Sequence, residues 1–365
     1  MARIGVNALY LIPGGVGGTE IYLRELLAAL ARIDAQNEYF IFTNLETGQD
    51  VAPKQANFQW KPQAVEAKFR PARIVWEQTV LPLEASRYSL DVLLNPGFTA
   101  PILAPCRLVT VMHDLQHKRH PEYFRWFDLP FWRFFLWASV HRSARIIAVT
   151  EATRADLLTF YRIPAERIRV VHHGVDAALL ELRRDRVERF VLCVSTLHPH
   201  KNIDRLIRAY GRERRDYKLV IAGMRGFHAE AIERLIGELG VGTQVKLTGW
   251  ISRTELYSLY DRALACVYPS TFEGFGMPVL EALAAGVPLL CSEIPPLREV
   301  AGDAALFFDP LSDDELARGL TRIVSDEPLR TKLAAKARER ARTFTWERTA
   351  QETLDVLLKR DKLAK

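Results

Sequence analysis

Cysteine is scarce in this 365-residue sequence, and its four cysteines form no CxxC pair. They stand far apart, three of them in apolar runs, so neither a disulfide framework nor a zinc site is indicated, and we expect reduced thiols at Cys106, Cys193, Cys266 and Cys291. No apolar run reaches the roughly 20 residues that span a bilayer. The first residues run into a strand without a signal-peptide pattern. We therefore expect a cytoplasmic protein.

Charge of one sign is not concentrated anywhere along the chain. The net charge is +6, but basic and acidic residues are interspersed. This balance suits an anionic ligand or a phospholipid surface without requiring either. We expect no nucleic-acid partner.

The sequence is rich in short apolar runs that alternate with helical patterns. Six such runs precede an arginine-rich interruption at 181–189, and six follow it. Near-continuous hydrophobic strands followed by helices predict parallel sheets covered on both faces. Two series predict an α/β fold of two doubly wound Rossmann-like domains, 1–173 and 174–345, facing across a cleft, with a helix in 346–365 crossing back to the first domain. A (β/α)8 barrel is the alternative architecture.

Residues that directly follow strands are the most informative, because open parallel sheets bind ligands at the carboxyl ends of their strands. Gly14, Gly15, Gly17 and Gly18 follow the first predicted strand and open a helix, so backbone N–H groups there can approach an anion, with a flexible turn as the alternative. The pattern is neither a dinucleotide fingerprint nor a P-loop. His113 follows another predicted strand, where it suits either a role in orienting substrate or a capping or core position.

A second polar strand end opens the second predicted domain. Ser195 and Thr196 end an apolar run, and Lys201 stands at a helix start with Asn202 beside it. A lysine there opposes the helix dipole unless an anion lies between them. A phosphate-binding lysine is therefore favoured over a solvated one.

The segment 270–286 enters an apolar helix through two glutamates, Glu273 and Glu281. Pro278 suits the first turn of that helix. We expect backbone amides to point into the space between the glutamates at Gly274, Phe275, Gly276 and Met277. A nucleoside-diphosphate sugar fits these groups, with Glu281 on the ribose diol, Lys201 on the diphosphate and Glu273 on the sugar hydroxyls. The alternative is that both glutamates only compensate the helix dipole.

Taken together, these residues resemble a retaining glycosyltransferase of family 4 with the GT-B fold, nearest in look to mannosyltransferases of surface-polysaccharide assembly. The resemblance covers nearly the whole chain and is carried by the glycine loop, the triplet Trp76–Gln78, His113, PHKNIDRLIRAY and, most specifically, EGFGMPVLEALAAG. It implies transfer of a hexose from a nucleoside-diphosphate sugar to a hydroxyl of a glycan or lipid-linked acceptor.

The resemblance also implies roles for particular residues. It places the donor sugar at Glu273, the ribose at Glu281 and the diphosphate at Lys201, with His113 near the reacting sugar. It further places a nucleobase beside Trp250 and Ile251. Same-face substitution is implied, in which the leaving phosphate oxygen helps to deprotonate the acceptor.

Two departures from the family pattern affect the phosphate site and the hinge. Ser195 stands where many members carry an arginine, and His173 replaces the asparagine of the usual hinge motif. No DxD-like carboxylate pair follows a strand, so we expect no metal and no cofactor. Fixed amides and a cation can stabilise the leaving diphosphate in place of magnesium.

Two other functions are alternatives to sugar transfer. A nucleotide-sugar epimerase needs an acid and a base beside the sugar, and only His113 is a candidate. A catalytically silent nucleotide-sugar-binding subunit is opposed by the intact Glu273, Lys201 and Glu281. The base and sugar of the donor and the identity of the acceptor stay undetermined.

The segment 123–137 holds nine aromatic residues with basic residues around them. Trp, Phe and Arg on one helix suit a membrane interface that presents a lipid-linked acceptor. A helix buried against the first sheet, or an acceptor or subunit surface, are the alternatives. The membrane reading would make the protein peripheral at the inner face of the membrane.

Overall fold

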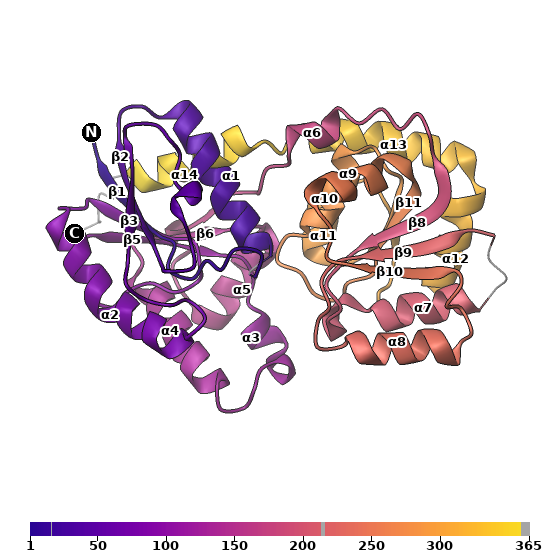
Figure 1. Cartoon of the computed structure of the whole chain (residues 1–365), viewed down its shortest axis with the longest axis horizontal. Helices are drawn as coiled ribbons and strands as arrows, with labels where there is room; N and C mark the ends of the chain where they lie inside the picture. The colour runs from indigo at the N-terminus through magenta and orange to yellow at the C-terminus, as the bar shows by residue number, and fades with distance from the viewer. Residues whose placement is uncertain (16, 213–215, 359–365) are drawn as a thin grey trace. The chain divides into compact units, whose positions relative to one another are not determined.

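The structure, a computed structural model, describes residues 1–15, 17–212 and 216–358, which form two compact units (Figure 1). The first unit comprises Met1–Gly174 together with the C-terminal helix that begins at Trp346. The second unit is Val175–Thr345. The domain boundaries expected from the sequence were placed at 173/174 and 345/346.

The first unit is built on a seven-stranded parallel sheet in the order β3-β2-β1-β4-β5-β6-β7. Val6 in the central strand lies opposite Ile41 on one side and Leu94 on the other. The strands are β1 (Arg3–Asn7), β2 (Glu38–Thr43), β3 (Phe58–Pro62), β4 (Val92–Asn95), β5 (Arg107–Met112), β6 (Arg145–Ala148) and β7 (Ile168–Val170). All except β3 coincide with predicted apolar runs.

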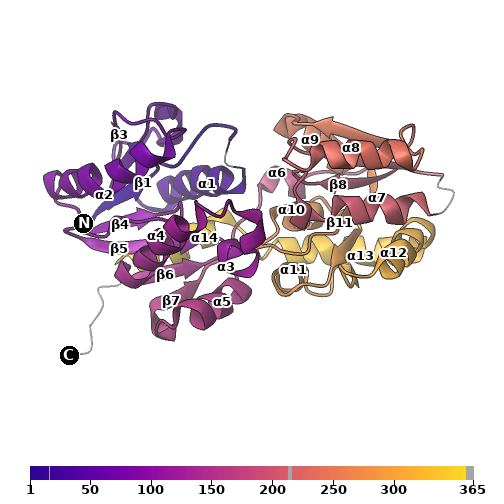
Figure 2. The same cartoon turned by 90° about the horizontal axis from the view of Figure 1, so that it is seen from below.

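Helices cover both faces of this sheet. They are α1 (Gly18–Ile33), α2 (Arg70–Arg87), α3 (Gln116–Arg119), α4 (Leu129–Arg142), α5 (Glu151–Tyr161) and α14 (Trp346–Leu358), with 3-10 turns η1 (Gln49–Val51), η2 (Pro121–Tyr123) and η3 (Ala165–Arg167). Right-handed crossovers put α1 on one face and α2 and α4 on the other, because they lead across the sheet in opposite directions. α14 packs on α1. Figures 1 and 2 show α2 and α4 next to each other.

The second unit has a six-stranded parallel sheet in the order β10-β9-β8-β11-β12-β13. The strands are β8 (Glu188–Val194), β9 (Lys218–Ala222), β10 (Val245–Gly249), β11 (Ala263–Tyr268), β12 (Leu289–Ser292) and β13 (Leu306–Phe308). Cys193, Cys266 and Cys291 are buried free thiols in this sheet, as predicted.

The helices of the second unit follow the same rule of handedness. They are α6 (Ala177–Leu180), α7 (Ile203–Gly211), α8 (Ala229–Glu238), α9 (Arg253–Arg262), α10 (Met277–Ala284), α11 (Pro295–Ala301), α12 (Asp313–Ser325) and α13 (Glu327–Ala341), with the 3-10 turn η4 (Pro199–Lys201). α7 and α8 lead from β8 outwards through β9, whereas α10 and α11 lead from β11 in the opposite direction and cover the other face. α9 begins with a capping box between Ser252 and Glu255.

In the part of the chain that the structure describes, no helix combines the length and the apolar character needed to cross a bilayer.

Candidate functional site

The point where the crossovers change direction in the second unit lies between β8 and β11. These strands are neighbours, yet β8 leads to β9 on one side and β11 leads to β12 on the other. Such a switch point leaves an opening at the carboxyl ends of the two strands, which is where open α/β sheets bind ligands. Lys201 follows β8 and Glu273 follows β11, so the topology alone brings these two predicted residues to the same opening.

Backbone and side-chain hydrogen bonds join the two loops at this opening. The N–H of Thr271 donates to the carbonyl of His200 at 2.8 Å, and the Ser270 hydroxyl donates to the same carbonyl at 3.1 Å. The buried amide of Asn202 donates to the carbonyls of Pro269 and Pro310 at 3.1 and 2.9 Å. Asn202, which was predicted to contact the donor, thus uses its side chain to fix the loops.

Lys201 and Glu273 form an ion pair whose Nζ and Oε1 atoms are 2.5 Å apart. The Tyr268 hydroxyl donates to the same carboxylate oxygen at 2.7 Å and accepts from Lys201 at 3.2 Å. The side chains of Lys201 and Glu273 are only 16% and 11% exposed. Burial alone would raise the pKa of Glu273, but the Lys201 ammonium and the tyrosine hydroxyl lower that pKa below its ordinary value. The carboxylate is therefore ionised and held in one orientation.

Glu281 lies in α10, where its Oε2 accepts a hydrogen bond from the hydroxyl of Tyr260 at 2.9 Å. Burial raises the pKa of Glu281 to about 7, and the tyrosine hydrogen bond and the charge of Arg253 offset only part of that rise. The two glutamates of the same segment thus differ. Glu273 has a cationic partner in contact, whereas the protonation of Glu281 changes near neutral pH.

The start of α10 has an unusual backbone. Gly276 caps the helix at φ 94°, and a Cβ at this position would lie 2.3 Å from Cδ2 of Leu297. Only glycine adopts this conformation and fits this space without strain. Phe275 is buried and lies edge-on to Phe344. Of the four residues predicted to present amides, Phe275 and Gly276 are buried and Gly274 and Met277 are partly buried, and contact of their amides with the donor stays a prediction.

The remaining donor-site candidates of the second unit follow β8 and β10. Ser195 is buried, and its hydroxyl donates to the carbonyl of Thr196 at 3.1 Å. Trp250 is 70% exposed and comes directly after β10, the outermost strand, with the partly buried Ile251 beside it. An exposed indole at the strand ends is available for stacking on a planar ring.

The glycine loop of the first unit precedes α1, which Gly17 caps with a φ of 58°. A Cβ at Gly17 or at Gly18 would meet nothing within 4 Å. The N–H of Gly14 donates to Glu20 at 2.8 Å, and Glu20 also forms an ion pair with Arg24 at 2.9 Å. At Gly15 a Cβ would lie 3.0 Å from the Ile12 side chain.

His113 follows β5 and is buried in the first unit. Its Nε2 lies 2.9 Å from the carbonyl of Pro96, which can only accept, so Nε2 carries the proton. The imidazole packs edge-on against Tyr22, Phe98 and His173. Burial lowers its pKa to about 4, so the ring is neutral at neutral pH. These contacts describe a packed histidine, and the role near the reacting sugar stays a prediction.

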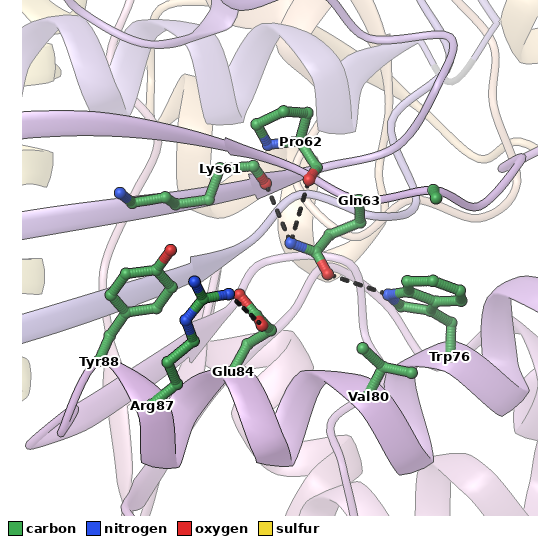
Figure 3. Close-up of a pocket in the computed structure, with 9 residues that line it drawn as sticks. Lys61, Pro62, Gln63, Trp76, Val80, Glu84, Arg87 and Tyr88 are labelled. Carbon is green, nitrogen blue, oxygen red and sulfur yellow. Dashed lines mark hydrogen bonds and ion pairs between the residues drawn. The ribbon is translucent and has the colours of Figure 1, made fainter.

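A pocket of about 260 Å³ lies in the first unit between β3 and α2 (Figure 3). Lys61, Gln63, Trp76, Glu84 and Tyr88 are among its lining residues. The Trp76 indole donates to the Gln63 side chain at 3.1 Å. The predicted site residues lie elsewhere in the described chain.

Among the residues described, there is no group of three or more His, Cys, Asp or Glu side chains placed to hold a metal ion.

Comparison with known proteins matches both units. Residues 16–179 match the model of Glycosyltransferase Family 4, and residues 181–340 match the model of Glycosyl transferases group 1. An O-antigen chain mannosyltransferase B of Escherichia coli is 28% identical over 265 residues, which are 68% of this chain and 70% of that protein. An MMP alpha-(1->4)-mannosyltransferase of Mycolicibacterium hassiacum is 31% identical over 68% of this chain and 64% of its own length, so less than two thirds of that relative is matched.

Solved structures agree on the fold. Alr3699/HepE of Anabaena, determined in complex with UDP and glucose, superposes with a TM-score of 0.76 at 18% identity and covers 98% of this chain and 100% of its own. This similarity confirms the two Rossmann-like domains of the GT-B class that the sequence predicts.

Proposed function

Because the chain belongs to the glycosyltransferases that join a family 4 domain to a group 1 domain, we propose that it transfers a hexosyl group from a nucleoside-diphosphate sugar to a hydroxyl of a glycan or lipid-linked acceptor. The proposal includes retention of the anomeric configuration and independence of metal. A mannosyl donor is favoured because both relatives named above are mannosyltransferases. If the acceptor is lipid-linked, the segment 123–137 is the part of the chain that meets the membrane.

The observation that carries the proposal is the Lys201–Tyr268–Glu273 cluster at the β8/β11 switch point. An ammonium has three N–H donors, and two of those of Lys201 are directed at Glu273 and Tyr268. The third can donate to the diphosphate while the ion pair stays intact. Glu273, ionised and fixed, can then accept from hydroxyls of the sugar, and positioning of this kind lowers the barrier to transfer.

The other residues bind different parts of the donor. In the proposal, Glu281 accepts from the ribose diol, Trp250 and Ile251 flank the nucleobase, and the N-terminal amides of α10 face the diphosphate. The bond between the sugar C1 and the phosphate oxygen breaks, and the acceptor oxygen bonds to C1 on the same face. The proton of the acceptor hydroxyl passes to the leaving diphosphate. Lys201 and the helix terminus supply the positive charge that the diphosphate requires.

The first test is a thermal-shift panel of GDP, UDP, ADP, dTDP and their common sugars, because a ligand that binds only the folded chain raises its melting temperature. We expect one base to stand out, and its sugars then become the donors in a transfer assay. Nucleoside diphosphate should be released only when acceptor is present. Release without acceptor, or a flat panel with responsive controls, would overturn the proposal.

The second test is the substitution Glu273→Gln. It should lower kcat by roughly a hundredfold or more, because the charged acceptor that positions the sugar is lost. The affinity for the free nucleoside diphosphate should change little. The matched control is Glu293→Gln in the same unit, an exposed glutamate paired with Arg298, which should leave kcat unchanged. Full activity of Glu273→Gln would remove this residue from the mechanism.

Stereochemistry and metal dependence are read from the same assay. The anomeric proton of the product, followed by NMR, should show the configuration of the donor. EDTA should leave the rate nearly intact, and a rate that is lost with EDTA and restored by magnesium would refute metal independence.

A further inference from the structure

Helix α4 carries large apolar side chains on opposite sides, yet only one of these sides is buried. Leu136 and Val140 face the core of the first unit. On the outer side Phe131, Phe134 and Trp137 are 46, 52 and 51% exposed. A helix that is hydrophobic all round is normally enclosed by protein or lipid. The first unit encloses α4 on one side only.

The exposed aromatic side chains continue beyond the helix. Trp126 and Phe127, directly before α4, are 84 and 56% exposed. We name the surface formed by these five side chains the aromatic face: Trp126, Phe127, Phe131, Phe134 and Trp137. Exposed aromatic side chains that gather on one short segment in this way are typical of a site of contact with a partner or a membrane.

Helix α2 lies beside α4 (Figures 1 and 2). The guanidinium of Arg70, at the start of α2, lies 3.6 Å from the centre of the Trp132 ring. On the outer side of α2, Val75 and Leu83 are 62 and 68% exposed.

The loop between β4 and β5 is hydrogen-bonded to both helices. Its N–H at Ile102 donates to Gln78 of α2 at 2.8 Å, and its carbonyl at the same residue accepts from Arg142 of α4 at 2.8 Å. Leu103, the next residue of this loop, is 73% exposed. Exposed apolar side chains therefore lie on both helices and on the loop that is hydrogen-bonded to each of them.

Basic residues border this surface. In the segments 68–87 and 118–142, with the buried Arg73 and Glu77 left out, lysine and arginine outnumber aspartate and glutamate by eight to three. Arg125 and Arg133 are exposed among the aromatic side chains themselves. An apolar surface rich in Trp and Phe with a basic border is complementary to the headgroup region of an anionic bilayer.

We infer that the aromatic face, with the outer side of α2 and Leu103, binds the surface of an anionic lipid bilayer. The aromatic rings enter the interface between headgroups and acyl chains, and the arginines contact lipid phosphates. A second copy of the chain fits this surface less well. A two-fold contact would set the same excess of positive charge against itself.

This inference deepens the proposal of a lipid-linked acceptor, because it gives the first unit a means of reaching one. It concerns the first unit alone and does not require the transfer reaction. A chain that binds vesicles but transfers no sugar would contradict the proposed function and leave the lipid surface standing. A chain that transfers sugar to a water-soluble acceptor but does not bind vesicles would contradict the lipid surface and support the proposed function.

The experiment is vesicle sedimentation of the full chain. We expect it to pellet with vesicles of phosphatidylcholine mixed with phosphatidylglycerol, to pellet less with phosphatidylcholine alone, and to be released by salt. The triple substitution Phe131→Ser, Phe134→Ser and Trp137→Ser should lower the affinity for the mixed vesicles at least about tenfold, because it removes most of the apolar area that enters the interface. Arg125→Gln with Arg133→Gln should abolish most of the preference for anionic lipid.

The matched control replaces three exposed apolar residues that lie outside the surface: Leu45→Ser, Val187→Ser and Leu311→Ser. It should bind vesicles like the unchanged chain. Circular dichroism and nucleotide binding report whether each variant is folded. Two results would overturn the inference: the unchanged chain stays in the supernatant with mixed vesicles, or the aromatic triple variant binds as the control does. A dimer in sedimentation equilibrium that the triple variant alone dissociates would assign the surface to self-association instead.

Discussion

At the scale of single residues, two partly buried glutamates of one segment are placed in opposite electrostatic environments. Glu273 has an ammonium in contact and is ionised, whereas Glu281 has a phenol as its hydrogen-bond partner and a pKa raised to about 7. A carboxylate must be ionised to accept both hydroxyls of a ribose diol. Donor binding should therefore be coupled to the ionisation of Glu281, and not to that of Glu273.

The binding of nucleoside diphosphate should depend on pH. The affinity for nucleoside diphosphate should rise as the pH increases through about 7, by up to about tenfold per pH unit below the pKa, because binding selects the ionised form of Glu281. Calorimetry across this range measures it. Glu281→Gln should bind more weakly and lose this component of the pH dependence. The phosphate titrates alike with both proteins, so the difference between the two curves belongs to Glu281, and parallel curves would exclude it from the ribose site.

The raised pKa of Glu281 also makes the stability of the folded chain depend on pH. A group whose pKa is higher in the folded than in the unfolded chain stabilises the fold below its unfolded pKa. That contribution is lost as the pH rises through the folded value of about 7. The stability of the unchanged chain relative to Glu281→Gln should therefore fall as neutral pH is approached from below.

Sequence patterns located the charged residues of the candidate site but not their partners. Lys201 and Glu273 could be found because a charge at the entrance of a helix calls for an explanation. Tyr268 and Tyr260 could not, because an aromatic residue in a buried strand or helix resembles core and nothing in its spacing shows where its hydroxyl points. The hydrogen bonds of the Asn202 side chain to two distant carbonyls could not be predicted either, because they leave no local signal in the sequence.

At the scale of elements, α10 depends on the glycine that caps its N-terminus. Gly276 combines a φ of 94° with a Cβ position 2.3 Å from Leu297. Gly276→Ala should therefore cost about 1–3 kcal/mol of the unfolding free energy of the second unit, from backbone strain and overpacking. Urea unfolding followed by circular dichroism measures this loss.

Gly237→Ala is the control for this substitution. Gly237 lies in the last turn of α8, and a Cβ there would meet nothing within 4 Å. The replacement should be neutral or should stabilise by up to about 1 kcal/mol, because alanine is the better helix former. Equal effects of the two substitutions would show that α10 does not need its left-handed start.

Elements differ in how well the sequence predicts them. The central strands are continuous apolar runs and could be read directly. β3 was missed because it lies at the sheet edge, where Phe58 is buried but Gln59 and Lys61 are partly exposed, so the run is broken by polar residues. The segment 123–137 was left open because burial against a sheet and insertion into lipid call for the same residue types. The structure shows that one side of α4 is buried and that the other is exposed, and contact of the exposed side with lipid stays a prediction.

At the scale of the whole molecule, the order of the sequence and the order of the folding units differ. The chain enters the second unit after Gly174 and returns to the first at Trp346. Helix α14 then packs on α1, with an ion pair between Arg32 and Glu347 at 2.6 Å. The hydroxyl of Thr349 donates to the carbonyl of His172 at 2.7 Å. The last described helix is therefore part of the first unit's core.

This arrangement predicts that a defect in α14 destabilises the first unit and spares the second. Ala350 of α14 is fully buried, so Ala350→Asp places an unpaired charge in the core and should cost about 3–5 kcal/mol. In calorimetry, one of two transitions should move to lower temperature, and limited proteolysis should cleave within 1–174 while 175–345 persists.

Gln351→Asp, exposed on the same helix, is the control. It adds repulsion with Asp355 one turn later, worth only about 0.2–0.5 kcal/mol. A shift of both transitions by equal amounts with Ala350→Asp would mean that the two units unfold as one, because a helix that belonged to the first unit alone could not destabilise the second.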